Sequence, residues 1–408
     1  MTIGLRMRAP LGRLPFFIVA ATALLGLSGG PLDAQSFFAN PVTDPVVGAD
    51  RGSASQIRKL DENTGFLTLT NTGTEESGPL VLGFGYAFPK LVRPGDQFDV
   101  AAIWAGPSDD GWRELLAGGL SYRFPTATEG LTGFVNLDFG DLILGTADAL
   151  ALDVRGDRVQ VSAGVAKTRD LGDTATLRFG AEVIARRTRS EVLGTPAIDE
   201  DLRMVRGSVL YSKGRPLGVQ HRLALSVTKG FDAFGASPSG NPLGSTPGAR
   251  TDFLRAAFAA ETSRPFGPDW VLNMGVIGQW SDDSLPASQR CGFETNNYAR
   301  AFDYAVVAGD RCLGSRVEVA YNFQSPDLRR GSFDSTQGFI GIDGGRISNN
   351  ANALSAGGSD GWASLSVGVR TLQGSILAEV AATRILDRPT VATGQDRDRL
   401  WVRAAYQF

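Results

Sequence analysis

Residues able to do acid–base or nucleophilic chemistry are scarce in this chain of 408 residues, which has one His and two Cys. A Ser–His–Asp triad or a zinc site needs imidazole or thiolate groups gathered in one place. The single His, His221, stands beside Arg222 at the start of an expected strand, and we interpret it as a surface or luminal residue. The sequence therefore predicts a protein that is not an enzyme and that carries no cofactor or metal.

The other charged and glycine-rich motifs also do not indicate a ligand-binding site. The pairs Asp109–Asp110 and Asp282–Asp283 offer oxygen ligands of the kind that calcium prefers, but we interpret them as solvated loop carboxylates. Gly83-Phe84-Gly85 lies inside an expected strand, without the helix that a phosphate-binding loop requires. With 40 Lys+Arg against 43 Asp+Glu, the chain lacks the basic excess that indicates a nucleic-acid partner.

The amino-terminal segment 1–34 has the pattern of a secretory signal peptide. Three arginines precede an apolar run from Leu14 to Leu27, and the segment ends at the small residue Ala34. The alternative is a membrane anchor, for which the run is short and interrupted. We expect an exported bacterial protein in which residues 35–63 form a tail or a short luminal plug.

Two cysteines, Cys291 and Cys312, stand 21 positions apart in a chain that we expect to be exported. Disulfides form in oxidising compartments outside the cytoplasm. We therefore predict a disulfide that closes the intervening loop. Two free thiols are the alternative.

Apolar residues alternate with small or polar ones over most of the mature chain. In one example Leu80, Leu82, Phe84 and Tyr86 are separated by smaller residues, and the same period recurs in segments 116–124, 159–165, 177–183, 317–323 and 363–369. Because side chains on a strand point alternately to its two faces, each segment has one apolar face. A soluble, secreted β-rich protein would show the same period.

Three features favour a membrane barrel over a soluble sheet. Aromatic residues such as Tyr86, Trp104 and Tyr122 stand near the ends of apolar faces, where membrane barrels carry aromatic girdles. The alternating runs approach about ten residues, whereas soluble strands average about five or six. The chain ends on Tyr406-Gln407-Phe408, which resembles the C-terminal signal that barrel assembly machinery reads on bacterial outer-membrane proteins.

The predicted fold class is therefore all-β: a transmembrane antiparallel outer-membrane β-barrel of sixteen strands spanning residues 64–408. An unpaired strand edge in lipid would leave backbone groups without partners, so the barrel must close. The expected strands begin near Phe66, Leu80, Phe98, Leu115, Leu131, Arg158, Ala175, Met204, Arg222, Phe253, Leu272, Val317, Gly338, Ala363, Ile376 and Leu400.

Four motifs resemble two-partner secretion transporters of the haemolysin-activator family (ShlB/FhaC/HecB-like), within the BamA-like superfamily. Segments Thr68–Gly78 and Pro94–Phe98 resemble the first hairpin and the segment after it. Segment Leu285–Phe293, followed by Ala299-Arg300-Ala301-Phe302, resembles the family's loop with its Val-Arg-Gly-Tyr/Phe motif. Segment Ile342–Arg346 resembles the Phe-x-Asp-x-Gly motif of a later strand, with Asp343 and Gly345 at the matching positions.

The resemblance implies that this loop folds back into the barrel lumen, where Arg300 would pair with Asp343 and Phe302 would pack beside them. A guanidinium can bind a carboxylate through two hydrogen bonds, and such a pair can hold a long loop against a wet wall. Solvated charges that never meet are the alternative. Alanine replaces the motif's glycine at Ala301, and alanine adopts positive φ less readily, so we expect a different loop conformation.

The resemblance also implies a function and its partners. Family members export a polypeptide client, such as a large β-helical exoprotein, through a loop-gated barrel, and they contact outer-membrane lipid and the barrel assembly machinery. Members also carry periplasmic POTRA domains before the barrel, for which residues 35–63 are too few. The alternative is a barrel without client recognition that acts as a passive channel or a structural surface protein.

Overall fold

The computed structural model describes residues 64–71, 79–107, 112, 114–143, 153–172, 174–214, 218–293, 298–302, 307–324, 334–390 and 396–408. None of these residues forms a helix long and apolar enough to cross a membrane. The predicted signal peptide, the segment 35–63, Asp109–Asp110 and most of the first hairpin motif lie outside the described residues.

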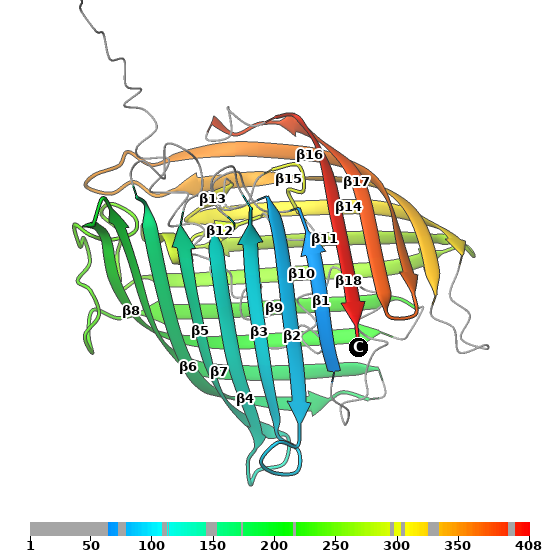
Figure 1. Ribbon diagram of the computed structural model, residues 1–408, viewed down its shortest axis with the longest axis horizontal. Helices are drawn as coiled ribbons and strands as arrows, with labels where there is room; N and C mark the ends of the chain where they lie inside the picture. Colours follow the sequence, from blue (N-terminus) through cyan, green and yellow to red (C-terminus); the bar gives the residue numbers. More distant parts are fainter. Residues whose placement is uncertain are drawn as a thin grey trace, which may run out of the picture.

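Sixteen antiparallel strands close into one barrel (Figure 1). They are β1 (Thr64–Thr70), β2 (Leu80–Pro89), β3 (Gln97–Gly106), β4 (Leu115–Pro125), β5 (Leu131–Ile143), β6 (Arg155–Asp170), β7 (Ala175–Val192), β8 (Thr195–Gly214), β9 (Gln220–Gly230), β10 (Leu254–Phe266), β11 (Trp270–Trp280), β14 (Arg311–Gln324), β15 (Ser335–Asn349), β16 (Gly358–Gln373), β17 (Ile376–Asp387) and β18 (Asp398–Gln407). A 3-10 turn, η1 (Ala287–Gln289), and a small hairpin of β12 (Cys291–Gly292) and β13 (Ala308–Gly309) lie between β11 and β14.

The predicted all-β barrel and its sixteen strands are confirmed. Most strands begin close to the expected residue, but β8 begins at Thr195 rather than near Met204, and β14 at Arg311 rather than near Val317. Both strands start with polar or charged residues that continue past the apolar band. The apolar alternation marks only the part of a strand that contacts lipid, so it locates the starts of these strands too late.

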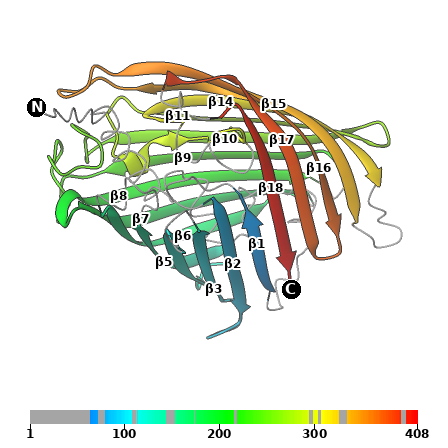
Figure 2. The same cartoon turned by 45° about the horizontal axis from the view of Figure 1, so that its top comes forward.

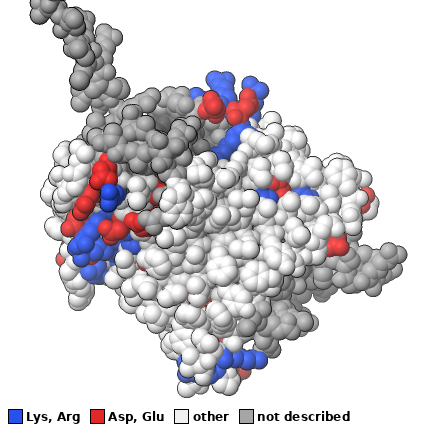
Figure 3. Space-filling model, in the orientation of Figure 1, with Lys and Arg blue, Asp and Glu red and all other residues white. Residues whose placement is uncertain are grey.

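The apolar face of each strand points outward. Leu80, Leu82 and Phe84 are exposed in the isolated chain, whereas Gly83 and Gly85, on either side of Phe84, are buried. Large exposed apolar side chains recur on the outer faces of the other strands, where a barrel contacts lipid. On the face seen in Figure 3, most charged side chains gather near the margins, and most of the surface between them is uncharged.

The longest strands, β7 and β8, carry a charged outer face beyond the apolar band. Arg189 lies opposite Asp199 and Arg187 opposite Asp201 in the strand register, with Arg189 Nε 3.6 Å from Asp199 Oδ1. Paired charges of this kind suit the polar layer outside a bilayer. This hairpin lies at the end of the barrel opposite to Phe408. In the usual orientation of such barrels, the end that carries the hairpin is extracellular.

The barrel closes where β1 meets β18, and Figure 2 shows these two strands side by side. Their register runs over five residue pairs, from Phe66↔Gln407 to Thr70↔Arg403. This is the shortest register of any neighbouring pair in the barrel wall; the next shortest, between β1 and β2, runs over seven. The β1–β18 closure is therefore held by fewer backbone pairs than any other pair of neighbouring strands in the barrel wall.

Candidate functional site

The segment between β11 and β14 folds into the lumen, and we call its described residues, 281–293 and 298–302 with 307–310, the luminal loop. In Figure 1 its hairpin β12–β13 lies within the ring of strands. Its tip packs an apolar cluster against the inner wall, made of Phe293, Tyr298, Ala299, Ala301, Phe302, Val307, Ile347, Trp362 and Ile385. The loop tip thus packs on the inner side of the barrel wall, and the role that the resemblance implies for it stays a prediction.

The base of the loop is fixed by one buried carboxylate, Asp310, which is 1% exposed. Its Oδ1 accepts a hydrogen bond of 3.0 Å from the Leu285 backbone N–H and lies 3.6 Å from Arg290 Nε. Its Oδ2 accepts a hydrogen bond of 2.7 Å from the backbone N–H of Asn350, in the loop between β15 and β16. Asp310 therefore joins both ends of the luminal loop to a neighbouring loop.

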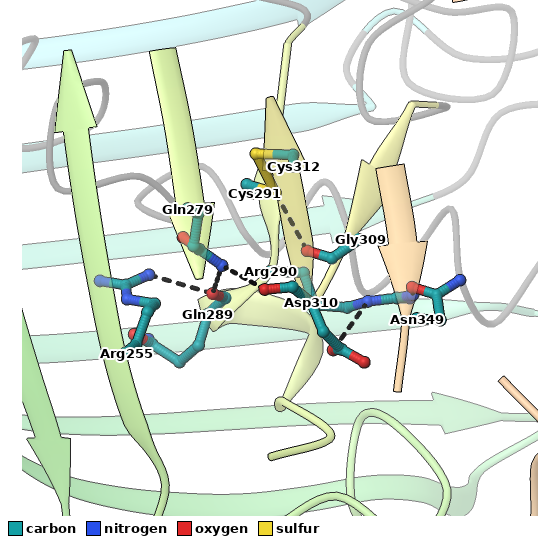
Figure 4. Close-up of a disulfide and its surroundings, with 9 residues drawn as sticks. All are labelled: Arg255, Gln279, Gln289, Arg290, Cys291, Gly309, Asp310, Cys312 and Asn349. Atoms are coloured by element: carbon teal, nitrogen blue, oxygen red, sulfur yellow. Dashed lines mark hydrogen bonds and ion pairs between the residues drawn. A yellow bond between two sulfur atoms is a disulfide. The ribbon is translucent and has the colours of Figure 1, made fainter. Parts of the chain in front are cut away.

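A disulfide between Cys291 and Cys312 adds a covalent link at the same place (Figure 4). Their Cα atoms lie 6.4 Å apart, within the normal range for a disulfide. Cys291 belongs to β12, and Cys312 is the second residue of β14. The predicted bond is present, and it ties the luminal hairpin to the barrel wall.

The tip of the loop places Arg300 in a pocket of the wall, which we call the Arg300 pocket. Its Nη2 lies 3.2 Å from Glu379 Oε1 on β17, and its Nη1 lies 3.6 Å from Glu318 Oε2 on β14. The guanidinium also stacks over the rings of Trp401 on β18 and Phe339 on β15, 5.0 and 5.3 Å from their centroids. One side chain of the loop thus contacts four strands.

Glu318 is the centre of the charge network in this pocket, and its side chain is 0% exposed. Arg370 Nη2 donates to its Oε1 at 2.7 Å, Asn273 Nδ2 donates to the same oxygen at 3.0 Å, and Arg316 also forms an ion pair with it. Several donors around one desolvated carboxylate offset the cost of burying its charge. The wall therefore presents a preformed acidic seat to the loop.

Asp343 is placed beside this seat and receives the loop through its backbone. The backbone N–H of Ala299 donates to Asp343 Oδ2, and Ser364 Oγ donates to Oδ1 at 2.6 Å. The loop motif and the later-strand motif therefore meet, one residue away from Arg300. The predicted direct pairing of Arg300 with Asp343 stays a prediction, because the ion pairs resolved for Arg300 are those with Glu318 and Glu379.

The turn that presents Arg300 has positive φ at Ala299, at 51°, rather than at Ala301. The Phe302 N–H donates to the Ala299 carbonyl at 2.9 Å and closes the turn. The Phe302 ring then packs edge-on against Trp362, with ring centroids 6.0 Å apart, and Phe293 packs on the same indole at 4.8 Å. The Ala299 hydrogen bond to Asp343 holds the residue that adopts the left-handed conformation.

Gly345 has a steric role beneath this cluster. A Cβ at Gly345 would lie 2.8 Å from Gly314 Cα on β14 and 3.0 Å from Trp362 Nε1 on β16. These distances leave no room for a side chain. The absence of one leaves room for Trp362, on which Phe293 and Phe302 of the loop pack.

Arg399 on β18 connects the loop tip to the closure of the barrel. Its Nη1 donates to the Phe302 carbonyl at 2.9 Å, and its Nη2 donates to the Asn71 carbonyl at 2.5 Å. Asn71 follows β1, and its side chain continues the strand pairing by bonding the Leu400 carbonyl at 2.5 Å and the Val402 N–H at 2.8 Å. Sequence reasoning did not identify this connection: Asn71 lies within the first-hairpin motif but had no assigned role, and Arg399 belongs to no motif.

The remaining predicted residues have structural contacts. His221 Nδ1 lies 3.0 Å from Thr262 Oγ1. Arg311 donates a hydrogen bond to Asp282, and the Leu254 backbone N–H donates one to Asp283. Asp282 and Asp283 are thus partnered rather than only solvated. The described part of the chain has no cluster of His, Cys, Asp and Glu suited to a metal.

The C-terminal residues lie on the outer face. Tyr406 and Phe408 stack with ring centroids 5.8 Å apart, and both are exposed in the isolated chain. Phe408 also exchanges two backbone hydrogen bonds with Gly65, of 2.7 and 2.9 Å. Their predicted role as an assembly signal stays a prediction.

Comparison with solved structures shows the same barrel fold. The chain is similar to CdiB from Escherichia coli, with 16% identity, a TM-score of 0.69, and coverage of 85% of this chain and 63% of that one. CdiB from Acinetobacter baumannii is 13% identical, with a TM-score of 0.64 and coverage of 85% of this chain and 60% of that one. BamA from Haemophilus ducreyi lacking POTRA domains 1–3 is 9% identical, with a TM-score of 0.57 and coverage of 86% of this chain and 71% of that one. The chain thus spans less than two thirds of either CdiB chain.

Sequence comparison is more specific than the shared fold. No curated protein matches the sequence significantly. The model of the haemolysin secretion/activation protein family ShlB/FhaC/HecB matches residues 61–371, which include the luminal loop, the Asp343 motif, and Glu318 and Phe339 of the Arg300 pocket. The chain belongs to this family of bacterial outer-membrane barrels.

Proposed function

We propose that this barrel exports a polypeptide client across the bacterial outer membrane, as a two-partner secretion transporter. Membership of the haemolysin secretion/activation family carries the proposal. The luminal loop supports it, because a side chain that contacts four strands from inside the lumen is well placed to block a path along the barrel axis.

In this proposal the luminal loop is the gate. The Arg300 pocket holds its tip, while Asp310 and the disulfide hold its base. An arriving client would have to displace the tip, which requires breaking contacts with Glu379 and Glu318. Glu318 keeps its ion pairs with Arg316 and Arg370, so only part of the network needs to open.

The remaining parts of the proposal concern energy and partners. Folding of the client outside the cell would supply the free energy of transport, and no catalytic step is involved. The outer apolar faces would contact outer-membrane lipid, and the barrel assembly machinery would insert the chain by reading Tyr406 and Phe408.

The test is deletion of the gene in its native host, followed by proteomic comparison of surface-exposed and released proteins. We expect one large secreted protein to disappear from the outside and to return when the gene is restored. Small-solute uptake should stay unchanged. Unchanged secretion with reduced solute uptake would contradict the proposal and favour a passive channel, and unchanged secretion with unchanged uptake would favour a structural surface protein.

A further inference from the structure

A second hold on the luminal loop lies on strands β7, β10 and β11, across from the Arg300 pocket. Arg186 Nη1 donates to the Ser288 carbonyl at 3.2 Å, and Arg255 Nη1 donates to the Gln289 carbonyl at 3.0 Å. Gln279 Nε2 donates to the same Gln289 carbonyl at 2.9 Å. In Figure 4, Arg255 and Gln279 converge on Gln289 from two neighbouring strands.

All these hydrogen bonds end on main-chain carbonyl groups. In these hydrogen bonds the donors bind the main chain of the loop, so a peptide of another sequence could offer the same acceptors. The site is also desolvated: Arg186 and Arg255 are each 3% exposed and Gln279 is 5% exposed. Hydrogen bonds from charged donors in such a place are stronger than in water.

The donors are positioned by the barrel wall and not by the loop. Gln160 Oε1 on β6 accepts from Arg186 Nε at 2.8 Å, and Gln160 itself donates to Asp138 Oδ2 on β5 at 3.2 Å. Arg255 Nη2 donates to Thr228 Oγ1 on β9 at 3.3 Å. Because these supports lie on rigid strands, the guanidinium groups stay directed into the lumen whatever peptide lies there.

We propose that Arg186, Arg255 and Gln279 form a binding site for the main chain of an extended polypeptide, and that Ser288 and Gln289 occupy it as an internal substitute while the loop is seated. The proposal rests on the proposed function, because it needs a polypeptide in the lumen. When the loop leaves, these donors lose the carbonyl groups of Ser288 and Gln289 and can bind other acceptors in the lumen. The carbonyl groups of a client supply them without regard to its sequence.

The experiment uses the full-length barrel in planar lipid bilayers and a synthetic peptide of glycine, serine and threonine as the probe. A peptide of about 30 residues is about 100 Å long when extended, which exceeds the thickness of the bilayer. The background variant is Arg300→Ala, which releases the loop tip. The quantity measured is the duration of current blockades while the pore is open.

We expect the double substitution Arg186→Gln/Arg255→Gln in this background to change both the frequency of openings and the duration of blockades. Openings become more frequent, because the loop loses its second hold. Blockades become shorter by about tenfold or more, since each lost hydrogen bond from a charged donor is worth about 1.5–3 kcal/mol. If the arginines only held the loop, openings would increase and blockade durations would stay the same, which would overturn the proposal.

The matched control is Arg222→Gln, which removes another luminal arginine whose Nη1 lies 3.6 Å from Glu261 on the barrel wall. Equal shortening of blockades in this control would overturn the proposal, as would an absence of blockades in the Arg300→Ala background. Heat-dependent migration on gels confirms that each variant is a folded barrel. The probe is synthetic, so a failed secretion experiment and a failed blockade experiment are separate results.

Discussion

The guanidinium of Arg300 on the luminal loop lies 3.2 Å from the carboxylate of Glu379 on β17. Glu379 is 2% exposed, and within the described residues no other cation forms an ion pair with it. Glu318, in contrast, keeps Arg316 and Arg370 when the loop leaves. Displacement of the loop therefore removes the resolved ion pair of Glu379, and this favours the seated state.

Replacing Glu379 by Gln should weaken the seat of the loop tip. The side chain keeps its size, and Arg300 keeps Glu318, so the fold persists while the closest ion pair of Arg300 is lost. Loss of a charge-assisted contact of about 1.5–3 kcal/mol raises the open fraction of the pore about tenfold or more. Single-channel recording in planar bilayers measures this fraction.

The control for this substitution is Glu261→Gln, which neutralises a luminal carboxylate whose resolved ion pair is with Arg222 of the wall. It should leave the open fraction within about twofold of the original. An open fraction that is the same in both variants would mean that Glu379 does not hold the loop.

Arg399→Gln should loosen the closure of the barrel. Arg399 is the link between Phe302 of the loop and Asn71, and the β1–β18 register beyond Asn71 has only five pairs. We expect amide hydrogen exchange in β1 to accelerate about tenfold, as loss of charge-assisted hydrogen bonds of about 1.5 kcal/mol predicts. Exchange in β10 should not change.

Arg384→Gln is the matched control for Arg399→Gln. Arg384 lies on the neighbouring strand β17, and it forms an exposed ion pair of 3.7 Å with Asp398. Exposed pairs contribute little to stability. If both variants accelerate exchange in β1 equally, the bridge through Arg399 does not determine the closure.

The disulfide makes a separate prediction. Replacing Cys291 and Cys312 by Ser opens a loop of 21 positions, and chain entropy alone assigns such a loop about 3 kcal/mol. The urea midpoint of unfolding should fall, with Trp fluorescence as the measurement. The original protein treated with reductant should behave like the double variant. Two reactive thiols in the unreduced, denatured protein would contradict the disulfide itself.

Most of the fold could be predicted from the sequence, because lipid imposes a simple rule on every strand: one face must be apolar. Leu80, Leu82 and Phe84 satisfy it, and their exposure in the structure confirms it. The same rule gives no information where a strand extends into water, and the early starts of β8 and β14 were missed for that reason.

The partners of Arg300 could not be predicted in the same way. Alternation indicates that Glu318 and Glu379 face the lumen, but not which inward residues lie opposite a loop tip. That depends on the tilt and curvature of the wall, which bring β14, β15, β17 and β18 around one point. The motif led only to Asp343, whose resolved contact with the loop is the Ala299 backbone.

The pH dependence of an outer loop gives the last prediction. In the loop between β9 and β10, Arg250 Nε and Nη2 donate to the two oxygens of Asp252 at 2.9 and 2.6 Å. The hydrogen bonds from Arg250 lower the pKa of Asp252 below its ordinary value of 3.8.

A lowered pKa in the folded state stabilises the loop at pH values above 3.8, and this stabilisation is lost as the pH falls through the lowered pKa. Asp252→Asn should therefore make loop 231–253 easier to cleave by pepsin at about pH 5, and the difference between the two proteins should disappear as the pH falls through the lowered pKa of Asp252. The control Asp153→Asn changes a carboxylate paired with Arg155 in another loop and should leave this cleavage unchanged. A ratio of cleavage rates between Asp252→Asn and the original protein that stays constant from about pH 5 to about pH 1 would contradict the prediction, because protonation of Asp252 removes the charge on which the difference depends.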